Sequence, residues 1–134
     1  MDFSTVNIIA VLVCGAASIV IGAFWFSPFL FGKLWQKLVG ISDEEIRNSF
    51  MPMVFVANFM LAALMALALS LFFGGKVGFT DGMLYGFFTG LFFVSTALGI
   101  MYIYERKPFL LWFINAGYNT LLFTAIGGIL GSWQ

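Results

Sequence analysis

The sequence predicts an all-α, polytopic membrane protein, with four transmembrane helices in a tight bundle and a short interfacial amphipathic helix between the first two spans. Three observations predict this class. Of the 134 residues, 62% are hydrophobic and only 9% are charged, whereas a water-soluble domain has about a quarter charged residues. Four apolar runs reach the ~20 residues that a membrane-crossing helix requires. Small side chains recur at four-residue spacing in all four runs.

The four runs place the spans at about 6–26, 50–73, 81–104 and 108–131. Because these spans use most of the chain, residues 1–134 are predicted to form a single transmembrane domain. The first run resembles a secretory signal only in its position. A signal peptide starts with positive charge and has a short apolar stretch, whereas this run has full spanning length and is preceded by Asp2 without any Lys or Arg.

The basic residues divide unequally between the two sides of the predicted bundle. Five lie in the connections after the first and third spans, and one lies in the connection after the second. These are Lys33, Lys37, Arg47, Arg106 and Lys107 on one side, and Lys76 on the other. Short loops rich in Lys and Arg stay cytoplasmic. We therefore expect a multi-pass protein of the bacterial cell (inner) membrane with both termini outside the cytoplasm.

The first connection contains a predicted surface helix at about 29–39, and Pro28 before it interrupts the first span. Apolar and polar side chains of this segment fall on different sides of a helix. They are Leu30, Phe31, Leu34, Trp35 and Leu38 against Lys33, Gln36 and Lys37. Such a helix lies in the headgroup layer with its ammonium groups in water. It is expected to be a plain anchor, with a gate or a docking site for anionic lipid as the functional alternative.

Two sequence signals mark helix ends. Ser42-Asp43-Glu44-Glu45 reads as a capping box, in which the Ser42 hydroxyl bonds the backbone N–H of Glu45. The acidic residues also lie at the positive end of the helix dipole, so they are interpreted as a helix start and not as a catalytic cluster. Gly74 is predicted to end the second span, because glycine adopts the left-handed turn that follows a helix.

A stripe of small residues follows each span. The residues are Ala10, Cys14, Ser18 and Gly22 in the first span; Asn58, Ala62, Ala66, Ser70 and Gly74 in the second; Gly82, Gly86 and Gly90 in the third; and Ala116, Thr120, Thr124, Gly128 and Ser132 in the fourth. Helix association in lipid depends on close van der Waals approach, which small residues permit. Ridges with this spacing favour right-handed crossings at about −40 to −50°. We expect each stripe to face a neighbouring helix.

Uncharged polar residues gather at depth in the fourth span. By helical rise Asn115 and Asn119 lie ~10 and ~16 Å from its start, and Asn58 lies ~9 Å into the second span. We expect these amides and Tyr118 to pair with one another or with backbone. In the alternative they line, together with Trp25, a polar site for a ligand or a lipid headgroup near the cytoplasmic side.

The composition disfavours several function classes. No span centre carries a charge, although proton- or cation-coupled small transporters need an ionisable residue within the membrane, so a four-span multidrug exporter is disfavoured. The chain has no His and one Cys, and we expect no metal site, no cofactor and no catalytic residue. A membrane enzyme acting on lipid is the least favoured class, because no nucleophile with its base is visible. Six basic and six acidic residues leave no basic footprint for nucleic acid.

Two segments carry a family resemblance. They are GAFWFSPFLFGKLW (22–35), followed by Gly40 before an acidic helix start, and FLLWFINAGYNTLLFTAIGGILGSW (109–133). Both resemble the uncharacterised prokaryotic membrane family catalogued as domain of unknown function 1761. The resemblance covers nearly the whole chain and implies four spans, and it implies no activity, cofactor or catalytic residue. Phe26 departs from the family pattern, in which Tyr often precedes the Ser-Pro pair.

Two functions remain open. The first is a homo-oligomeric binding or transport module with a polar intramembrane site near the cytoplasmic side; it requires several copies because one bundle of this size hardly encloses a conduction path. The second is a structural or accessory subunit that docks its smooth helical faces onto a larger membrane complex. In both, membrane lipid covers the remaining apolar surface.

Overall fold

The computed structural model describes residues 1–133 and confirms the all-α prediction. Four helical stretches are long and apolar enough to cross a membrane. They are α1 (Ile8–Trp25), α4 (Met51–Phe73), the continuous stretch of α5 (Phe79–Phe88), η2 (Thr89–Val94) and α6 (Ser95–Tyr104), and α7 (Phe109–Ser132). A short helix lies between the first two spans, as expected: it is α2 (Gly32–Val39).

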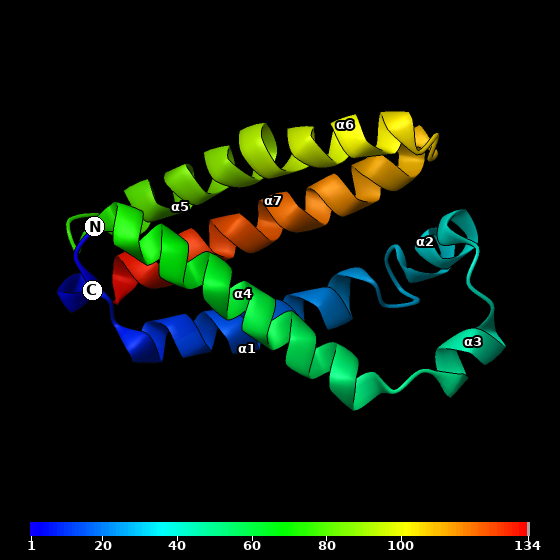
Figure 1. Cartoon of the computed structure of the whole chain (residues 1–134), viewed down its shortest axis with the longest axis horizontal. Coiled ribbons are helices and arrows are strands. Elements are labelled where there is room, and N and C mark those ends of the chain that lie inside the picture. The colour runs from blue at the N-terminus through cyan, green and yellow to red at the C-terminus, as the bar shows by residue number, and fades with distance from the viewer. Residues whose placement is uncertain (134) are drawn as a thin grey trace.

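The helices run between two ends of the bundle (Figure 1). One end, here called the terminal end, holds both termini and the connection between α4 and α5. At this end the Asn7 side chain donates a hydrogen bond to the Trp133 carbonyl over 2.9 Å, which joins the start of α1 to the end of α7. The opposite end, here called the basic end, holds the segment 26–50 and the turn between α6 and α7.

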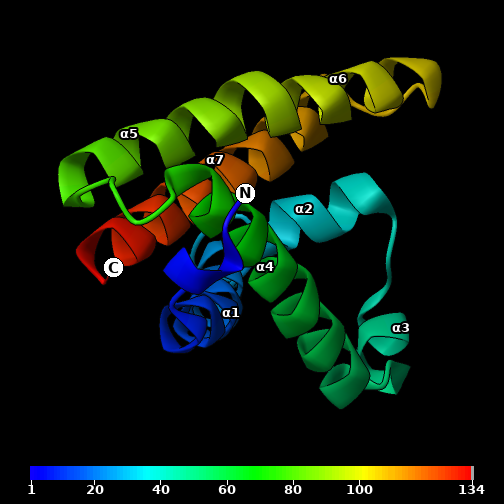
Figure 2. The same cartoon turned by 60° about the vertical axis from the view of Figure 1, so that its left-hand side comes forward.

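The bundle consists of two antiparallel helix pairs. The α5–η2–α6 stretch packs along α7, and α1 packs against α4. Contacts of α7 with α1 and, less extensively, with α4 join the two pairs. Toward the basic end α4 crosses α1 and diverges from α7 (Figures 1 and 2). The first seven residues of α4, 51–57, are consequently exposed on all sides.

Backbone-to-backbone packing joins α5 to α7. Gly82, Gly86 and Gly90 are all buried on the side of the third span that faces α7. A Cβ atom at Gly82 or Gly86 would overlap a carbonyl oxygen of α7, and one at Gly90 would lie 2.7 Å from the Thr120 Cα atom. The helices therefore approach more closely than any other side chain at Gly82 or Gly86 permits, which maximises dispersion contacts where lipid provides little driving force.

The core between the pairs lies in the half of the bundle nearer the terminal end. Ala10, Cys14 and Ser18 of α1 are fully buried. Leu122, Ile126 and Leu130 of α7 and Ala66 of α4 pack in the same region and are at most 2% exposed. The predicted stripes of α1 and α4 thus lie at helix contacts.

The segment 26–50 folds differently in detail from the sequence expectation. Helix α2 begins at Gly32, three residues after the expected start, because the Ser27 carbonyl accepts hydrogen bonds from the N–H groups of Leu30 and Gly32 and closes a turn. A separate helix, α3 (Asp43–Asn48), follows. The Ser42 hydroxyl accepts the Glu45 N–H over 3.1 Å, so the predicted cap is present.

The glycine that was expected to end the second span does so. Gly74 follows α4 with φ of 58°, and its N–H donates to the Ser70 carbonyl. This left-handed conformation is accessible to glycine without a steric penalty. The chain then reverses direction within a few residues, which places α5 beside α7 and antiparallel to it.

Candidate functional site

The third span contains a π-helical segment at η2, where it meets the middle of α7. π-helical turns are rare and are frequent at functional sites. The fully buried Ser95 hydroxyl follows this segment and lies 2.7 Å from the Gly90 carbonyl oxygen and 3.2 Å from the Ala116 carbonyl oxygen. The Trp112 indole donates to the Ser95 carbonyl over 2.7 Å. The bonds of Ser95 with Ala116 and Trp112 connect the end of the π-helical segment to α7.

Asn115 and Asn119 of α7 follow Trp112 by three and seven residues, a spacing that puts them on the same face of the helix. The Asn115 Nδ2 group donates to the Tyr102 hydroxyl of α6 over 2.7 Å. The Asn119 Nδ2 group donates to the Asn115 carbonyl oxygen over 2.8 Å, an acceptor that fixes which side-chain atom is nitrogen. No donor reaches either Oδ1 atom within residues 1–133.

These two amide oxygens are accessible. Every buried side-chain nitrogen or oxygen in the described part of the chain has a hydrogen-bond partner. Because the Oδ1 atoms of Asn115 and Asn119 have none, they must lie on accessible surface. Both side chains are partly buried, so their acceptors are not fully enclosed by the described chain. We call Tyr102, Asn115 and Asn119 the amide cluster.

Asn58 does not pair with Asn115, although the sequence predicted that these amides pair with one another or with backbone. Its side chain is partly buried and makes no hydrogen bond to any residue among 1–133. The physical reason is the divergence of α4 from α7 toward the basic end (Figure 2), which separates two residues that have similar depth. Asn115 pairs instead with the Tyr102 hydroxyl of α6.

Trp25 of α1 and Tyr118 of α7 take part in the contact between these two helices. The Trp25 indole donates to the Ile114 carbonyl over 3.1 Å and packs so closely on Gly117 that a Cβ there would lie 2.9 Å from the ring. The Tyr118 hydroxyl lies 3.5 Å from the Ser18 carbonyl oxygen. Neither side chain hydrogen-bonds to the amide cluster, so both act as contacts between α1 and α7.

The aromatic residues around this contact continue into the surface segment. Ring centroids of Trp25 and Phe31 lie 4.8 Å apart, those of Phe26 and Tyr118 5.1 Å apart, and those of Phe26 and Trp35 5.2 Å apart. Tilted aromatic pairs at such distances are favourable. They join the end of α1 and the start of α2 to α7, and we call these five residues the aromatic anchor.

The small-residue stripe of α7 faces the third span from Thr120 to Gly128, as expected. The Thr120 Cα atom lies beside Gly90, the Thr124 Cα atom lies beside Gly86, and Gly128 lies beside Phe79 and Met83. Phe123, Gly127 and Gly131 extend the same contact. Thr124 and Gly128 also line an apolar groove of about 660 Å³ beside α5. In the first span, Gly22 is partly buried beside the Tyr118 hydroxyl.

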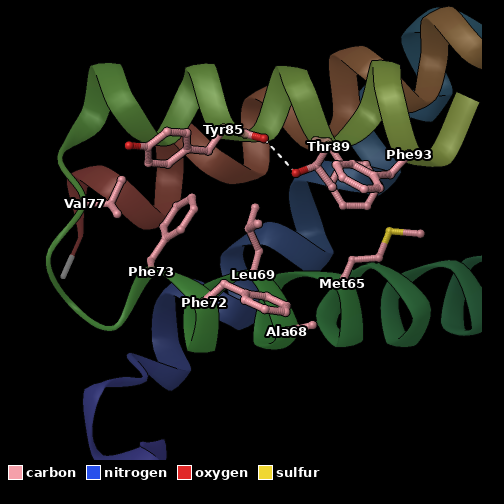
Figure 3. A pocket seen from close by; sticks show the side chains of 10 residues that line it. Met65, Ala68, Leu69, Phe72, Phe73, Val77, Tyr85, Thr89 and Phe93 are labelled. Atoms are coloured by element: carbon pink, nitrogen blue, oxygen red, sulfur yellow. Dashed lines mark hydrogen bonds between the residues drawn. The ribbon is translucent and has the colours of Figure 1, made fainter. Parts of the chain in front are cut away.

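A second apolar groove, of about 590 Å³, lies between α4 and α5 (Figure 3). Its lining includes Met65, Leu69 and Phe73 of α4 and Tyr85 of α5. The Thr89 hydroxyl in its wall donates to the Tyr85 carbonyl over 2.7 Å, so its hydrogen is used within the helix. The Tyr85 hydroxyl is the other polar side-chain group among the lining residues of this groove.

The amide cluster consists of carboxamides and a phenol. Such groups recognise a ligand through hydrogen bonds, with the amide oxygens accepting and the remaining N–H and O–H groups donating. Within residues 1–133, no three His, Cys, Asp or Glu side chains come together in a group able to hold a metal ion. Cys14 is buried in the α1 contact.

Comparison with known proteins places the chain in one family. A family model described as protein of unknown function (DUF1761) matches residues 9–131. No curated protein and no solved structure matches the chain.

Proposed function

Because the chain belongs to the DUF1761 family of proteins of unknown function, we propose its function from the geometry: it is a homo-oligomeric membrane module that binds or transports a small polar molecule at the amide cluster. The observation that carries this proposal is the pair of accessible acceptors at Asn115 and Asn119. An amide oxygen without a partner in hydrocarbon costs about 2–7 kcal/mol. A ligand that supplies N–H or O–H donors removes this cost.

The chemistry of the cluster limits the ligand class. The Asn115 and Asn119 oxygens call for hydrogen-bond donors, and the Tyr102 hydroxyl beside Asn115 offers a further polar group. A neutral or cationic molecule with several N–H or O–H groups satisfies this set. An anion without donors does not, because its oxygens would face the oxygens of the protein.

The charge distribution supports an orientation for the site. Five of the six basic residues lie at the basic end, which the preference of Lys and Arg for cytoplasmic loops places in the cytoplasm. Asn58 and Asn115 lie in the half of their helices nearer this end. The proposed site therefore opens toward the cytoplasm, with both termini on the opposite side of the cell membrane.

The exposed start of α4 supports assembly into oligomers. Residues 51–57 have no covering element in one copy of the chain, and α4 carries Asn58 directly after them. A second copy placed against this part of α4 would enclose the amide cluster from the side where α4 and α7 diverge. Several copies together then enclose a conduction path, which a single bundle of this size does not enclose.

The two apolar grooves favour a second candidate function, that of an accessory subunit. Grooves of about 660 and 590 Å³ flank α7 and have almost entirely apolar linings. Helices of a larger membrane complex would find shape and chemistry suited to them. In that case the protein would copurify with its partners and would not form a uniform assembly alone.

Structure determination of the full chain in lipid nanodiscs tests the proposal. The proposal predicts a uniform oligomer with non-protein density within hydrogen-bond distance of the Asn115 and Asn119 Oδ1 atoms. The matched control is Asn119→Leu, in which this density is lost while the fold remains. If both oxygens face only acyl chains in the wild-type assembly, the site proposal is wrong. A monomer that is recovered only with other proteins would favour the accessory role.

A further inference from the structure

We propose that the cleft between α2 and α3 at the basic end binds the phosphate headgroup of an anionic phospholipid. The cleft consists of two adjoining hollows of about 430 and 260 Å³ that share Lys33, Gln36 and Asp43. Arg47 lines the first hollow and Lys37 the second. This site is separate from the amide cluster and does not depend on the function proposed for it.

The charges of the cleft are unbalanced in favour of an anion. Lys33, Lys37 and Arg47 face a single lining carboxylate, that of Asp43. Asp43 is already engaged, because the Gln36 side chain donates to its Oδ1 atom over 2.7 Å. None of the three cations has an ion-pair partner in residues 1–133, where the one salt bridge joins Lys107 to Glu105. A phosphate therefore finds ammonium and guanidinium donors that no carboxylate of the described chain occupies.

The three cations come from different elements that the local fold brings together. Lys33 and Lys37 are four residues apart on α2 and so lie on one side of it. Gly40, with φ of 83°, ends α2 and redirects the chain so that α3 brings Arg47 back to the cleft. The Gln36–Asp43 hydrogen bond links the two helices directly. The arrangement is thus a folded site and not a run of neighbouring charges.

The apolar surroundings indicate a lipid and not a free phosphate. Phe26 and Trp35 line the cleft and pack against each other as a tilted pair with ring centroids 5.2 Å apart. The turn beside the cleft exposes Phe29 to 98%, and Leu30 and Leu34 are also exposed. Aromatic and aliphatic side chains of this kind insert at the boundary between headgroups and acyl chains. A phospholipid whose acyl chains cover these apolar side chains places its phosphate at the level of Lys33.

A matched pair of variants tests the site in the full chain purified in a neutral detergent. Lys33→Gln with Arg47→Gln removes two cleft cations. Arg106→Gln with Lys107→Gln removes two cations at the same end but outside the cleft. Lys107 has a different environment, since the Glu105 carboxylate bonds its ammonium group and raises its pKa. Both variants change the net charge equally, so a general attraction of anionic lipid to a basic surface affects them alike.

The probe is dioctanoyl phosphatidylglycerol, with dioctanoyl phosphatidylcholine and inorganic phosphate as comparisons, and binding is followed by tryptophan fluorescence because Trp35 lines the cleft. Wild type and R106Q/K107Q are expected to share one half-saturating concentration of phosphatidylglycerol. K33Q/R47Q is expected to raise it about tenfold or more. The charge-preserving variant K33R/R47K is expected to restore binding.

Four results would overturn the proposal: equal weakening in both double variants, equal binding of phosphatidylcholine, equal occupancy by inorganic phosphate alone, or no loss in K33Q/R47Q. The first shows general surface charge and the third shows a soluble anion as the ligand. If K33Q/R47Q does not remain monodisperse, Lys33→Gln compared with Lys107→Gln repeats the test with one charge removed from each place.

Discussion

Two groups of contacts along α7 differ strongly. In the packing contacts with α5 and α1, glycine backbones touch and the Trp25 indole packs on Gly117 and bonds the Ile114 carbonyl. In the amide cluster, Asn115 and Asn119 make one hydrogen bond each through Nδ2 and leave their oxygens without a partner in the described chain. The difference separates polar groups that hold helices together from polar groups that remain available to a ligand. Four substitutions test this separation.

The largest loss of stability is expected at a glycine in the contact between α5 and α7. Gly86→Leu places a side chain where the Phe123 carbonyl oxygen lies. Because backbone atoms on both helices must move apart, we expect a loss of about 3 kcal/mol in unfolding free energy. Thermal unfolding in detergent measures it, with Ala57→Leu on the exposed start of α4 as control. Equal stability of the two variants would show that α5 and α7 do not touch as described.

The contact between α1 and α7 should respond next. Trp25→Phe removes the indole N–H that bonds the Ile114 carbonyl, and it leaves a gap over Gly117. We expect a loss of about 2 kcal/mol in unfolding free energy. Trp133→Phe, at a half-exposed position at the terminal end, is the control and should change stability by less than about 0.5 kcal/mol. A reversed order would show that the aromatic anchor contributes no stability.

A smaller effect is expected where the π-helical segment meets α7. Ser95→Ala removes the buried hydroxyl that lies near the Gly90 and Ala116 carbonyl oxygens. Both carbonyls keep a second donor, the Ser95 N–H and the Thr120 hydroxyl respectively, so the expected loss is about 1 kcal/mol. The neighbouring Thr96→Val is the control, because the Thr96 hydroxyl is exposed and bonds only within its own helix. Equal losses in chemical unfolding would contradict the assignment.

The smallest effect on stability is expected in the amide cluster. Asn115→Leu removes the bond to the Tyr102 hydroxyl, and interhelical hydrogen bonds in membranes average about 0.6 kcal/mol. Thermal unfolding without added ligand should therefore change little. If Asn115→Leu lowers the unfolding free energy as much as Trp25→Phe does, Asn115 is a structural residue. The distinction between the packing contacts of α7 and the amide cluster would then fail.

The sequence predicted the spans well because length and hydropathy alone determine them. The structure begins and ends the helices within about two residues of the expected bounds, which is the usual uncertainty at helix ends. The capping box at Ser42 and the left-handed Gly74 were also predictable, since both depend on local geometry.

The candidate site was predictable only in part, because it depends on how the helices cross. Depth along a helix placed Asn58 and Asn115 at similar levels, but depth does not reveal that α4 diverges from α7. The Tyr102 partner comes from the π-helical span, and nothing in the sequence pattern indicated a π-helical turn at Thr89–Val94.

Cysteine accessibility at two neighbouring positions of α7 tests the central claim most directly. In a Cys14→Ser background, Asn115→Cys and Ala116→Cys place thiols at nearly the same depth, one in the amide cluster and one buried beside the Ser95 hydroxyl. A small charged methanethiosulfonate reagent should modify residue 115 readily and residue 116 hardly at all. Equal protection of both thiols would contradict an accessible polar site within this membrane protein.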